Sequence, residues 1–198
     1  INNALELAER THKEMEQLQA NNEALLQQAR EEREKMLNEA KQFSDKFIED
    51  AKIKANEEKD RIRKANNLPD HYLLSVGTIE KRKNTHRILE AVYEHNIDID
   101  IVMVGRKTEY FDEIKAYADS HGLTSRLHVY ERLGNADLPA IYQMADIFIY
   151  PSMYEGFGIP ILEAFFSGTP VITNSNGSTG EIAGNAAFTI NAPHKDNL

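Results

Sequence analysis

The chain has 198 residues and a formal net charge of −9 at pH 7, spread over both its halves without a basic stripe, which argues against a nucleic-acid partner. It has no cysteine, so disulfides and cysteine chemistry are excluded. No apolar stretch approaches the length that spans a bilayer, and the start lacks a signal-peptide pattern. We therefore expect a cytoplasmic chain with no membrane span.

Composition divides the chain into two parts of different character. All ten glycines lie at or after Gly77 and all six prolines at or after Pro69. Residues 1–62 are instead rich in Glu, Lys, Ala, Gln and Leu, which favour helix and do not end one. The sequence predicts a long charged helix over residues 1–62 and a globular domain over residues 63–198, truncated at its end.

Two rows of apolar residues with a spacing of eleven run along the predicted helix. One row is Leu7, Leu18, Ala29, Ala40, Ala51 and Ile62; the other is Ala4, Met15, Leu26, Leu37 and Ile48. Eleven residues complete three helical turns, so each row stays on one side of a helix about 90 Å long. The narrow apolar face predicts a partner helix, and a homodimer through this segment is the interpretation we consider. The charged flanks are typical of a solvated helix surface.

The segment LQANNEALLQQAREEREKMLNEAKQF, Leu18 to Phe43, resembles the peripheral stalk of the ATP synthase b subunit. The AREERE core and the eleven-residue spacing carry the resemblance. The membrane-spanning part and the C-terminal tip of that family have no counterpart here. A stalk or oligomerisation protein is therefore the second hypothesis for function.

From residue 63 onward, short apolar runs alternate with segments of helical spacing. The predicted strands are Tyr72–Val76, Ile99–Val104, Leu127–Tyr130, Ile147–Tyr150, Pro170–Thr173 and Ala187–Ile190. The predicted helices are Arg87–His95, Phe111–His121, Leu138–Met144 and Ile161–Phe166, the last with Pro160 in its first turn. This alternation predicts an α/β fold with a parallel, doubly wound, Rossmann-like sheet.

Ligands of such sheets bind beyond the carboxyl ends of the strands, so we examine the residues that follow each strand. Gly77 begins the loop after the first strand, which carries Arg82 and Lys83. The loop after the fourth strand, Pro151 to Gly158, contains glycines and leads into a helix. Free N–H groups at a helix N-terminus and nearby cations favour an anion, so this edge predicts a phosphate-bearing small molecule.

Four motifs in this part resemble retaining family-4 glycosyltransferases of the two-domain GT-B fold. SMYEGFGIPILEAFFSGTPVITN, from Ser152 to Asn174, has the two glutamates of that signature, Glu155 and Glu163, separated by seven residues. YLLSVGTIEKRKN is similar to the first strand and loop of their donor-binding domain, and VGRKTEY and ADLPAIYQMADIFIYPS agree in order and spacing. The resemblance covers roughly residues 64–198 and implies half of a GT-B fold.

The resemblance also implies roles for individual residues. Lys83 and Arg82 would contact the diphosphate of a nucleotide-diphosphate sugar, and the backbone N–H groups of Gly156, Phe157 and Gly158 would hold its phosphates and sugar. Glu163 would accept hydrogen bonds from the ribose hydroxyls. Glu155 would face the transferred sugar or order the loop. The nucleotide sugar is a donor substrate, and no cofactor or metal is implied.

The sequence departs from the family at Thr78, where some members have an arginine after the first-strand glycine. The family's N-terminal, acceptor-binding domain is also missing, and a helix stands in its place. We therefore expect donor binding without efficient transfer. The stalk protein and a nucleotide-binding module without catalysis stay open as alternatives. Asp98 and Asp100 look like a metal-binding Asp-x-Asp motif, but they begin a strand and are expected to be solvated.

Overall fold

The computed structural model describes residues 2–134 and 136–191. The predicted end of the domain at residue 198 and the side chain of Ala4 lie outside these described residues. The chain forms two compact units, Ile1–Ala55 and Asn56–Leu198. Within the described residues, no helix combines the length and the apolar character needed to cross a membrane.

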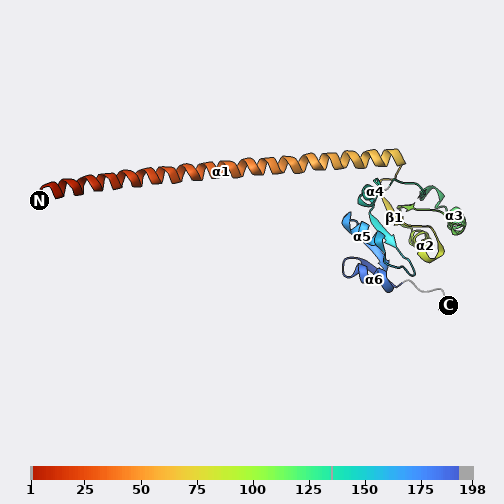
Figure 1. The fold of residues 1–198 in the computed structure, drawn as a ribbon. Coiled ribbons are helices and arrows are strands. Elements are labelled where there is room, and N and C mark those ends of the chain that lie inside the picture. The colour runs from red at the N-terminus through yellow and green to blue at the C-terminus, as the bar shows by residue number, and fades with distance from the viewer. Residues whose placement is uncertain (1, 135, 192–198) are drawn as a thin grey trace. The chain divides into compact units, whose positions relative to one another are not determined.

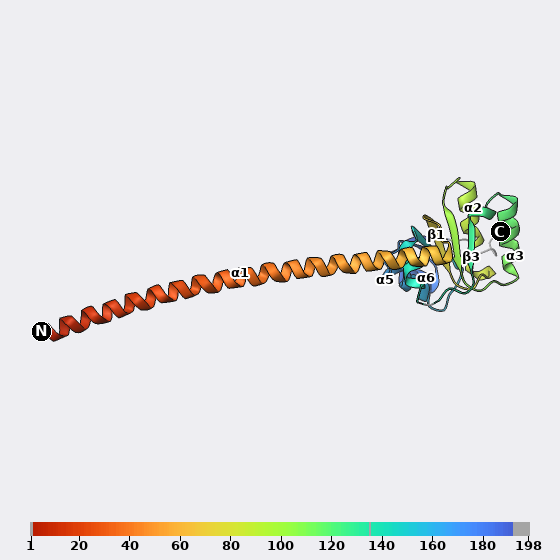
Figure 2. The same ribbon diagram turned by 90° about the horizontal axis from the view of Figure 1, so that it is seen from above.

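Helix α1, Asn2–Asn66, forms the described part of the first unit and continues into the second (Figures 1 and 2). The long helix predicted from composition is therefore present. Its large apolar row residues, from Leu7 to Ile48, are between 48% and 68% exposed. Ile62 differs from the rest of its row, because it is 1% exposed and packs in the core of the second unit. Ile62 is thus not available to a partner helix.

The second unit contains one parallel sheet with the strand order β3-β2-β1-β4-β5-β6. Its strands are β1 Tyr72–Val76, β2 Asp100–Val104, β3 Leu127–Tyr130, β4 Ile147–Tyr150, β5 Val171–Asn174 and β6 Phe188–Ile190. All five neighbouring pairs are parallel. The predicted α/β, Rossmann-like class is confirmed.

Helices cover both faces of this sheet. The helices are α2 His86–Glu94, α3 Tyr110–Ser120, α4 Leu138–Met144, α5 Ile159–Phe166 and α6 Gly177–Ala183, with short 3-10 helices η1 Lys81–Lys83 and η2 Thr124–Arg126. In both views α2 and α3 lie on one side of β1, and α5 and α6 lie on the other (Figures 1 and 2). The apolar residues follow this division, because Leu73 packs with α2 and α3 whereas Tyr72 and Leu74 pack with α4 and α5.

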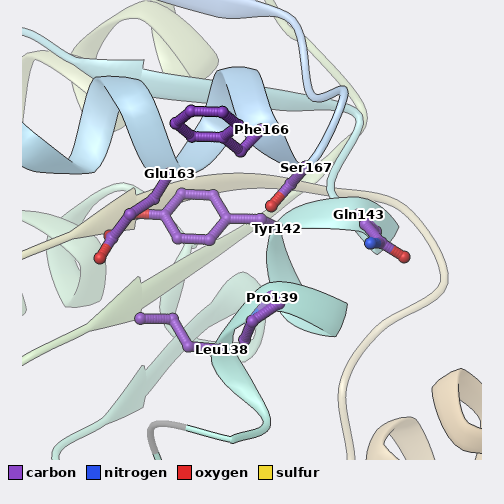
Figure 3. Close-up of a pocket in the computed structure, with 7 residues that line it drawn as sticks. All are labelled: Leu138, Pro139, Tyr142, Gln143, Glu163, Phe166 and Ser167. Atoms are coloured by element: carbon purple, nitrogen blue, oxygen red, sulfur yellow. The ribbon is translucent and has the colours of Figure 1, made fainter.

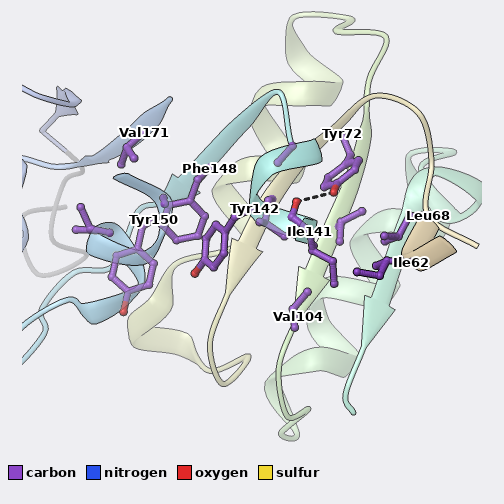
Figure 4. Packing of buried hydrophobic residues seen from close by; sticks show 14 residues of the cluster. Ile62, Leu68, Tyr72, Val104, Ile141, Tyr142, Phe148, Tyr150 and Val171 are labelled. Carbon is purple, nitrogen blue, oxygen red and sulfur yellow. Dashed lines mark hydrogen bonds between the residues drawn. The ribbon is translucent and has the colours of Figure 1, made fainter. Parts of the chain in front are cut away.

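The end of α1 completes the core on the α4–α5 face (Figure 4). Ile62 and Leu68 are buried there beside Tyr72 and Ile141. The hydroxyl of Tyr72 donates to the backbone oxygen of Ile141 at 2.6 Å, which satisfies a polar group in an otherwise apolar cluster. The last turns of α1 therefore belong to the globular unit by packing.

The predicted strands and helices after residue 66 agree with the structure to within two residues at their ends, whereas α1 ends at Asn66, four residues beyond the predicted end at residue 62. Helix α6 was not predicted. It is seven residues long with the sequence GSTGEIA, whose two glycines, serine and threonine disfavour helix. Its buried side chains are Thr179 and Ala183, so tertiary packing rather than intrinsic propensity accounts for this helix.

Candidate functional site

The sheet changes its direction of winding between β1 and β4. From β1 the chain moves outward through β2 to β3, then returns to pair β4 with the other side of β1 and continues outward to β6. Because all strands are parallel, the loops after β1 and β4 meet at the carboxyl edge of the sheet. Ligands of doubly wound sheets bind at this point, so these two loops define the candidate site.

Three charged side chains from these loops meet in one cluster, which we call the Lys83–Arg82–Glu155 cluster. One carboxylate oxygen of Glu155 lies 2.6 Å from Nζ of Lys83, and the other lies 2.9 Å from Nη1 of Arg82. Arg82 also pairs with Glu80 at 2.6 Å. The side chains of Glu155 and Lys83 are about nine-tenths buried, whereas that of Arg82 is 32% exposed. A single carboxylate therefore contacts both cations that the sequence assigned to an anion, and together with Glu80 it balances their two charges.

Lys83 has a second partner, Tyr150 at the end of β4. The ammonium group donates to the hydroxyl of Tyr150 at 2.6 Å and lies 4.6 Å from the centre of its ring. On another side Lys83 approaches Gly77, because a Cβ at that glycine would lie 3.4 Å from Nζ. The backbone of Gly77, the ring of Tyr150 and the carboxylate of Glu155 thus fix the end of a flexible side chain.

The cluster also changes the acid–base properties of its members. Burial alone would raise the pKa of Glu155, but hydrogen bonds from Lys83, Ser152 and Arg82 outweigh it, so this pKa lies below its ordinary value of 4.5. Burial and the nearby charge of Glu155 raise the pKa of Tyr150. At neutral pH Glu155 is therefore an anion, and Tyr150 is a neutral hydroxyl.

Hydrogen bonds from three directions hold the loop of residues 151–158. The N–H of Met153 donates to the oxygen of Arg82 at 2.8 Å, and Nδ2 of Asn174 donates to the oxygen of Ser152 at 3.1 Å. The hydroxyl of Ser178 on α6 donates to the oxygen of Glu155 at 2.8 Å. The loops after β1 and β4 are thus joined to each other, to the end of β5 and to α6.

The loop ends at the N-terminus of α5 with donors that the protein itself leaves free. Gly158 precedes the helix with φ of 99°, a left-handed conformation that glycine adopts without steric cost. In the part of the chain that the structure describes, the N–H groups of Gly156, Phe157 and Gly158 have no hydrogen-bond partner. A Cβ added to Gly156 would have no other residue's atoms within 4 Å, so the space beside this glycine is open. Free donors and the helix dipole make this a suitable place for an anion.

Glu163 lies in a pocket between α4 and α5 rather than in the cluster (Figure 3). The pocket has a volume of about 540 Å³ and is lined by Leu138, Pro139, Tyr142, Gln143, Glu163, Phe166 and Ser167. The hydroxyl of Tyr142 donates to Oε2 of Glu163 at 3.0 Å. Burial, followed by the charge of Glu163, raises the pKa of Tyr142. This hydroxyl therefore stays protonated and orients the carboxylate.

Thr78, Asp98 and Asp100, the other residues considered in the sequence, can now be placed relative to the site. Thr78 follows Gly77 at the site edge, so the missing arginine leaves Arg82 and Lys83 as the cations of the loop after β1 that contact Glu155. Asp98 is exposed and Asp100 begins β2, at the opposite edge of the sheet from the cluster. Both therefore lie away from the site, but only Asp98 is solvated as predicted, because Asp100 is half-buried with a carboxylate oxygen 3.7 Å from Nε2 of His128.

The sequence did not single out three residues that hold the site together, namely Tyr150, Tyr142 and Ser178. Each acts on a predicted residue through its hydroxyl group. Tyr150 lies directly before Pro151 at the end of an apolar strand, so the sequence pattern indicates only a core residue. Its position as the last residue of a central strand was the available signal, because that residue borders the carboxyl edge.

Comparison with known proteins gives a family match over most of the chain. The family model described as glycosyl transferases group 1 matches residues 56–197. O-antigen chain mannosyltransferase B of Escherichia coli is 33% identical over 121 residues, which make up 59% of this chain and 32% of that protein. The chain therefore spans about a third of the length of this relative.

Two solved structures show the same fold. One is the C-terminal domain of the glycosyl transferase group 1 family protein LpcC from Francisella tularensis, with a TM-score of 0.58 and 24% identity, covering 69% of this chain and 76% of that chain. The other is HepE from Anabaena in complex with UDP-glucose, with a TM-score of 0.62 and 18% identity, covering 72% of this chain and 41% of that chain. At these identities the likeness is one of fold.

Proposed function

Because this chain belongs to the glycosyl transferases group 1 family, we propose that its second unit is the donor-binding domain of a retaining, family-4 GT-B glycosyltransferase. The donor is a nucleotide-diphosphate sugar. The observation that carries the proposal is the convergence of Lys83 and Arg82 with the free N-terminus of α5 at the switch point of the sheet. HepE, which shares the fold, was solved with UDP-glucose.

The diphosphate would bind between the cluster and α5. Lys83 and Arg82 supply positive charge from one side, and the N–H groups of Gly156, Phe157 and Gly158 supply donors from the other. Cations and oriented N–H groups stabilise the charge that develops on a departing diphosphate. Glu155 would then be released from the cations to face the transferred sugar, since a diphosphate brings its own negative charge to them.

The ribose would bind at Glu163. A carboxylate accepts hydrogen bonds from a diol. The hydroxyl of Tyr142 already donates to Oε2 of Glu163, and this contact also fixes the direction of Oε1. The pocket beside Glu163 also carries apolar surface from Leu138 and Phe166 (Figure 3). This supports a nucleoside subsite on the α4 side of α5.

Transfer itself takes place between two domains in GT-B enzymes. We expect the present chain to bind the donor without efficient transfer, because the acceptor side would come from the other domain. The mannosyltransferase relative makes GDP-mannose one of the donors to test. The family match favours this function over a stalk protein.

Calorimetric titration with UDP-glucose, GDP-mannose and ADP-glucose tests the proposal. We expect saturable binding of one donor, with a loss of about tenfold or more in Lys83→Ala and in Glu163→Ala, since each removes a hydrogen bond to a charged group. Lys81→Ala is the matched control, because Lys81 lies in the same 3-10 helix but is exposed. Equal effects of Lys81→Ala and Lys83→Ala, or no binding by a folded chain, would contradict a donor site here.

We also propose that α1 mediates a homodimer. The large apolar side chains of both rows before residue 55 are exposed, and a second copy offers rows with the same eleven-residue spacing. Sedimentation equilibrium would show a dimer that is lost in the double variant Leu26→Glu and Leu37→Glu. The control variant Gln27→Glu and Asn38→Glu adds the same charge on a different side of the helix. A monomeric wild-type chain would exclude this role for the helix.

A further inference from the structure

We propose that Tyr150 is a positioning residue, which holds the ammonium group of Lys83 in place for the donor diphosphate after Glu155 has been displaced. The inference rests on the proposed donor site and adds to it a residue outside the predicted set. It follows from the different chemistry of the two partners of Lys83. Glu155 brings a negative charge, whereas Tyr150 brings a neutral oxygen and a ring.

The contact between Lys83 and Tyr150 uses both parts of the tyrosine side chain. The hydroxyl accepts a hydrogen bond from Nζ at 2.6 Å, and the ring centre lies 4.6 Å from the same nitrogen. A hydrogen bond from an ammonium group is stronger when both groups are shielded from water. Lys83 is 8% exposed and Tyr150 is 2% exposed, so this condition holds.

Tyr150 is itself fixed by the sheet. It is the last residue of β4, its ring stacks on that of Phe148 with centres 5.7 Å apart, and its backbone oxygen accepts a hydrogen bond from the hydroxyl of Thr173 at 2.9 Å. A group that is held this firmly can orient a flexible lysine. The lysine stem has several rotatable bonds, and ordering it at the moment of binding would lower the affinity for the donor.

A neutral partner is needed because a charged one competes with the ligand. Glu155 pairs with Lys83 and Arg82, and Glu80 also pairs with Arg82, so the two cations offer little net attraction to a diphosphate while Glu155 remains. Tyr150 leaves the full charge of Lys83 available. When the diphosphate replaces Glu155, the contacts of Tyr150 with Lys83 can persist, and the ammonium group remains at the carboxyl edge of the sheet.

The test compares ligands with and without phosphates. UDP, GDP and ADP, each beside its own nucleoside, are titrated into the wild-type chain, Tyr150→Phe and Tyr150→Leu. Tyr150→Phe keeps the ring and removes the hydroxyl, so we expect about a tenfold loss for the bound nucleoside diphosphate and no change for its nucleoside. Tyr150→Leu removes the ring as well and should lose more. Ile149→Ala, on the same strand but packed on the α2–α3 face of the sheet, is a packing control that should leave the diphosphate-to-nucleoside ratio unchanged.

A second measurement separates positioning from a general effect on the fold. In a Lys83→Ala background, Tyr150→Phe should cause no further loss of diphosphate affinity, because the residue through which it acts is absent. An equal tenfold loss in both backgrounds, or equal losses for the diphosphate and the nucleoside, would overturn the inference. If the wild-type chain binds the diphosphate and Tyr150→Phe binds it equally well, the inference fails while the donor site stands. If the folded wild-type chain binds none of the nucleotides, the proposed function fails first.

Discussion

Glu155→Gln is the substitution that tests the cluster most directly. Glu155 contacts Lys83 at 2.6 Å and Arg82 at 2.9 Å, so the carboxylate occupies the cations that a diphosphate would need. Glutamine has nearly the same shape and keeps an oxygen that can accept a hydrogen bond, but it carries no charge. We expect the variant to bind a nucleoside diphosphate more tightly than the wild-type chain and to be less stable without a ligand.

The burial of the cluster sets the size of both effects. The side chains of Glu155 and Lys83 are 9% and 10% exposed, and removing one member of a buried ion pair costs about 3 kcal/mol of folding stability. The contact with Arg82 adds less, because that side chain is 32% exposed and its charge is screened by water. If half of this energy contributes to the binding of an incoming diphosphate, the binding free energy improves by about 1.5 kcal/mol, which is slightly more than a tenfold gain in affinity.

Calorimetry with UDP, GDP and ADP and thermal unfolding with and without the bound nucleotide measure the two effects. Glu80→Gln serves as the control, since Glu80 contacts Arg82 but is 33% exposed and does not pair with Lys83. It should change both quantities only slightly. A variant Glu155→Gln that is as stable as the wild-type chain but binds the diphosphate more weakly would refute the competition, and would indicate that Glu155 holds the cations in place for the ligand.

The difference in stability between wild type and Glu155→Gln is expected to depend on pH. The pKa of Glu155 in the folded chain lies below 4.5, because the hydrogen bonds from Lys83, Ser152 and Arg82 outweigh the effect of burial. Its contribution to stability is therefore fully present above pH 4.5 and is lost as the pH falls through the lowered pKa. The difference in unfolding free energy between wild type and Glu155→Gln should shrink below pH 4.5, and a difference that grows there would contradict the pairing.

Three further substitutions test other parts of the structure. The Cβ added in Gly156→Ala meets no atom within 4 Å, so the free energy of unfolding should stay within about 0.5 kcal/mol of wild type while diphosphate affinity falls. Unchanged affinity would show that Gly156 is not part of the phosphate site. Ile62→Ala should destabilise the second unit by about 3 kcal/mol in urea unfolding, whereas Leu37→Ala, 58% exposed, should not; equal effects would contradict the packing of Ile62. Gly105→Ala would place a Cβ 2.0 Å from the oxygen of Gly77, so we expect a loss of more than about 3 kcal/mol in the same assay, and a near-neutral result would refute this close approach.

The fold could be predicted because its elements differ in their local patterns. Strands such as Ile147–Tyr150 and Leu127–Tyr130 were predicted with the bounds that the structure has, since short, mostly apolar runs bounded by charged residues or proline leave few alternatives. Helix α6 has no such pattern, and its buried Thr179 and Ala183 are recognisable as core residues only once β5 and β6 are in place. Local sequence therefore indicates an element only where its own pattern carries the signal.

The candidate site could be predicted as a set of residues but not as a set of contacts. The order of strands brings the loops after β1 and β4 together, and sequence patterns gave that edge as the place to look. Which charge pairs with which depends on side-chain directions, and these are set by the packed loops. The resemblance assigned Glu155 to the transferred sugar or to ordering the loop, and Lys83 to the diphosphate, whereas the structure joins the two side chains directly.

This joining changes how substitutions in the site must be interpreted. Lys83→Ala removes a cation from the ligand, but it also leaves the buried carboxylate of Glu155 with Arg82 as its remaining cation. Residues that share one network do not act additively. The loss of affinity in Lys83→Ala therefore combines the missing contact with the ligand and the poorer pairing of Glu155. The double variant of Lys83→Ala with Glu155→Gln separates them, because it removes the cation without leaving an unpaired charge. If Lys83 acts on the diphosphate itself, this double variant should bind more weakly than Glu155→Gln alone by about tenfold.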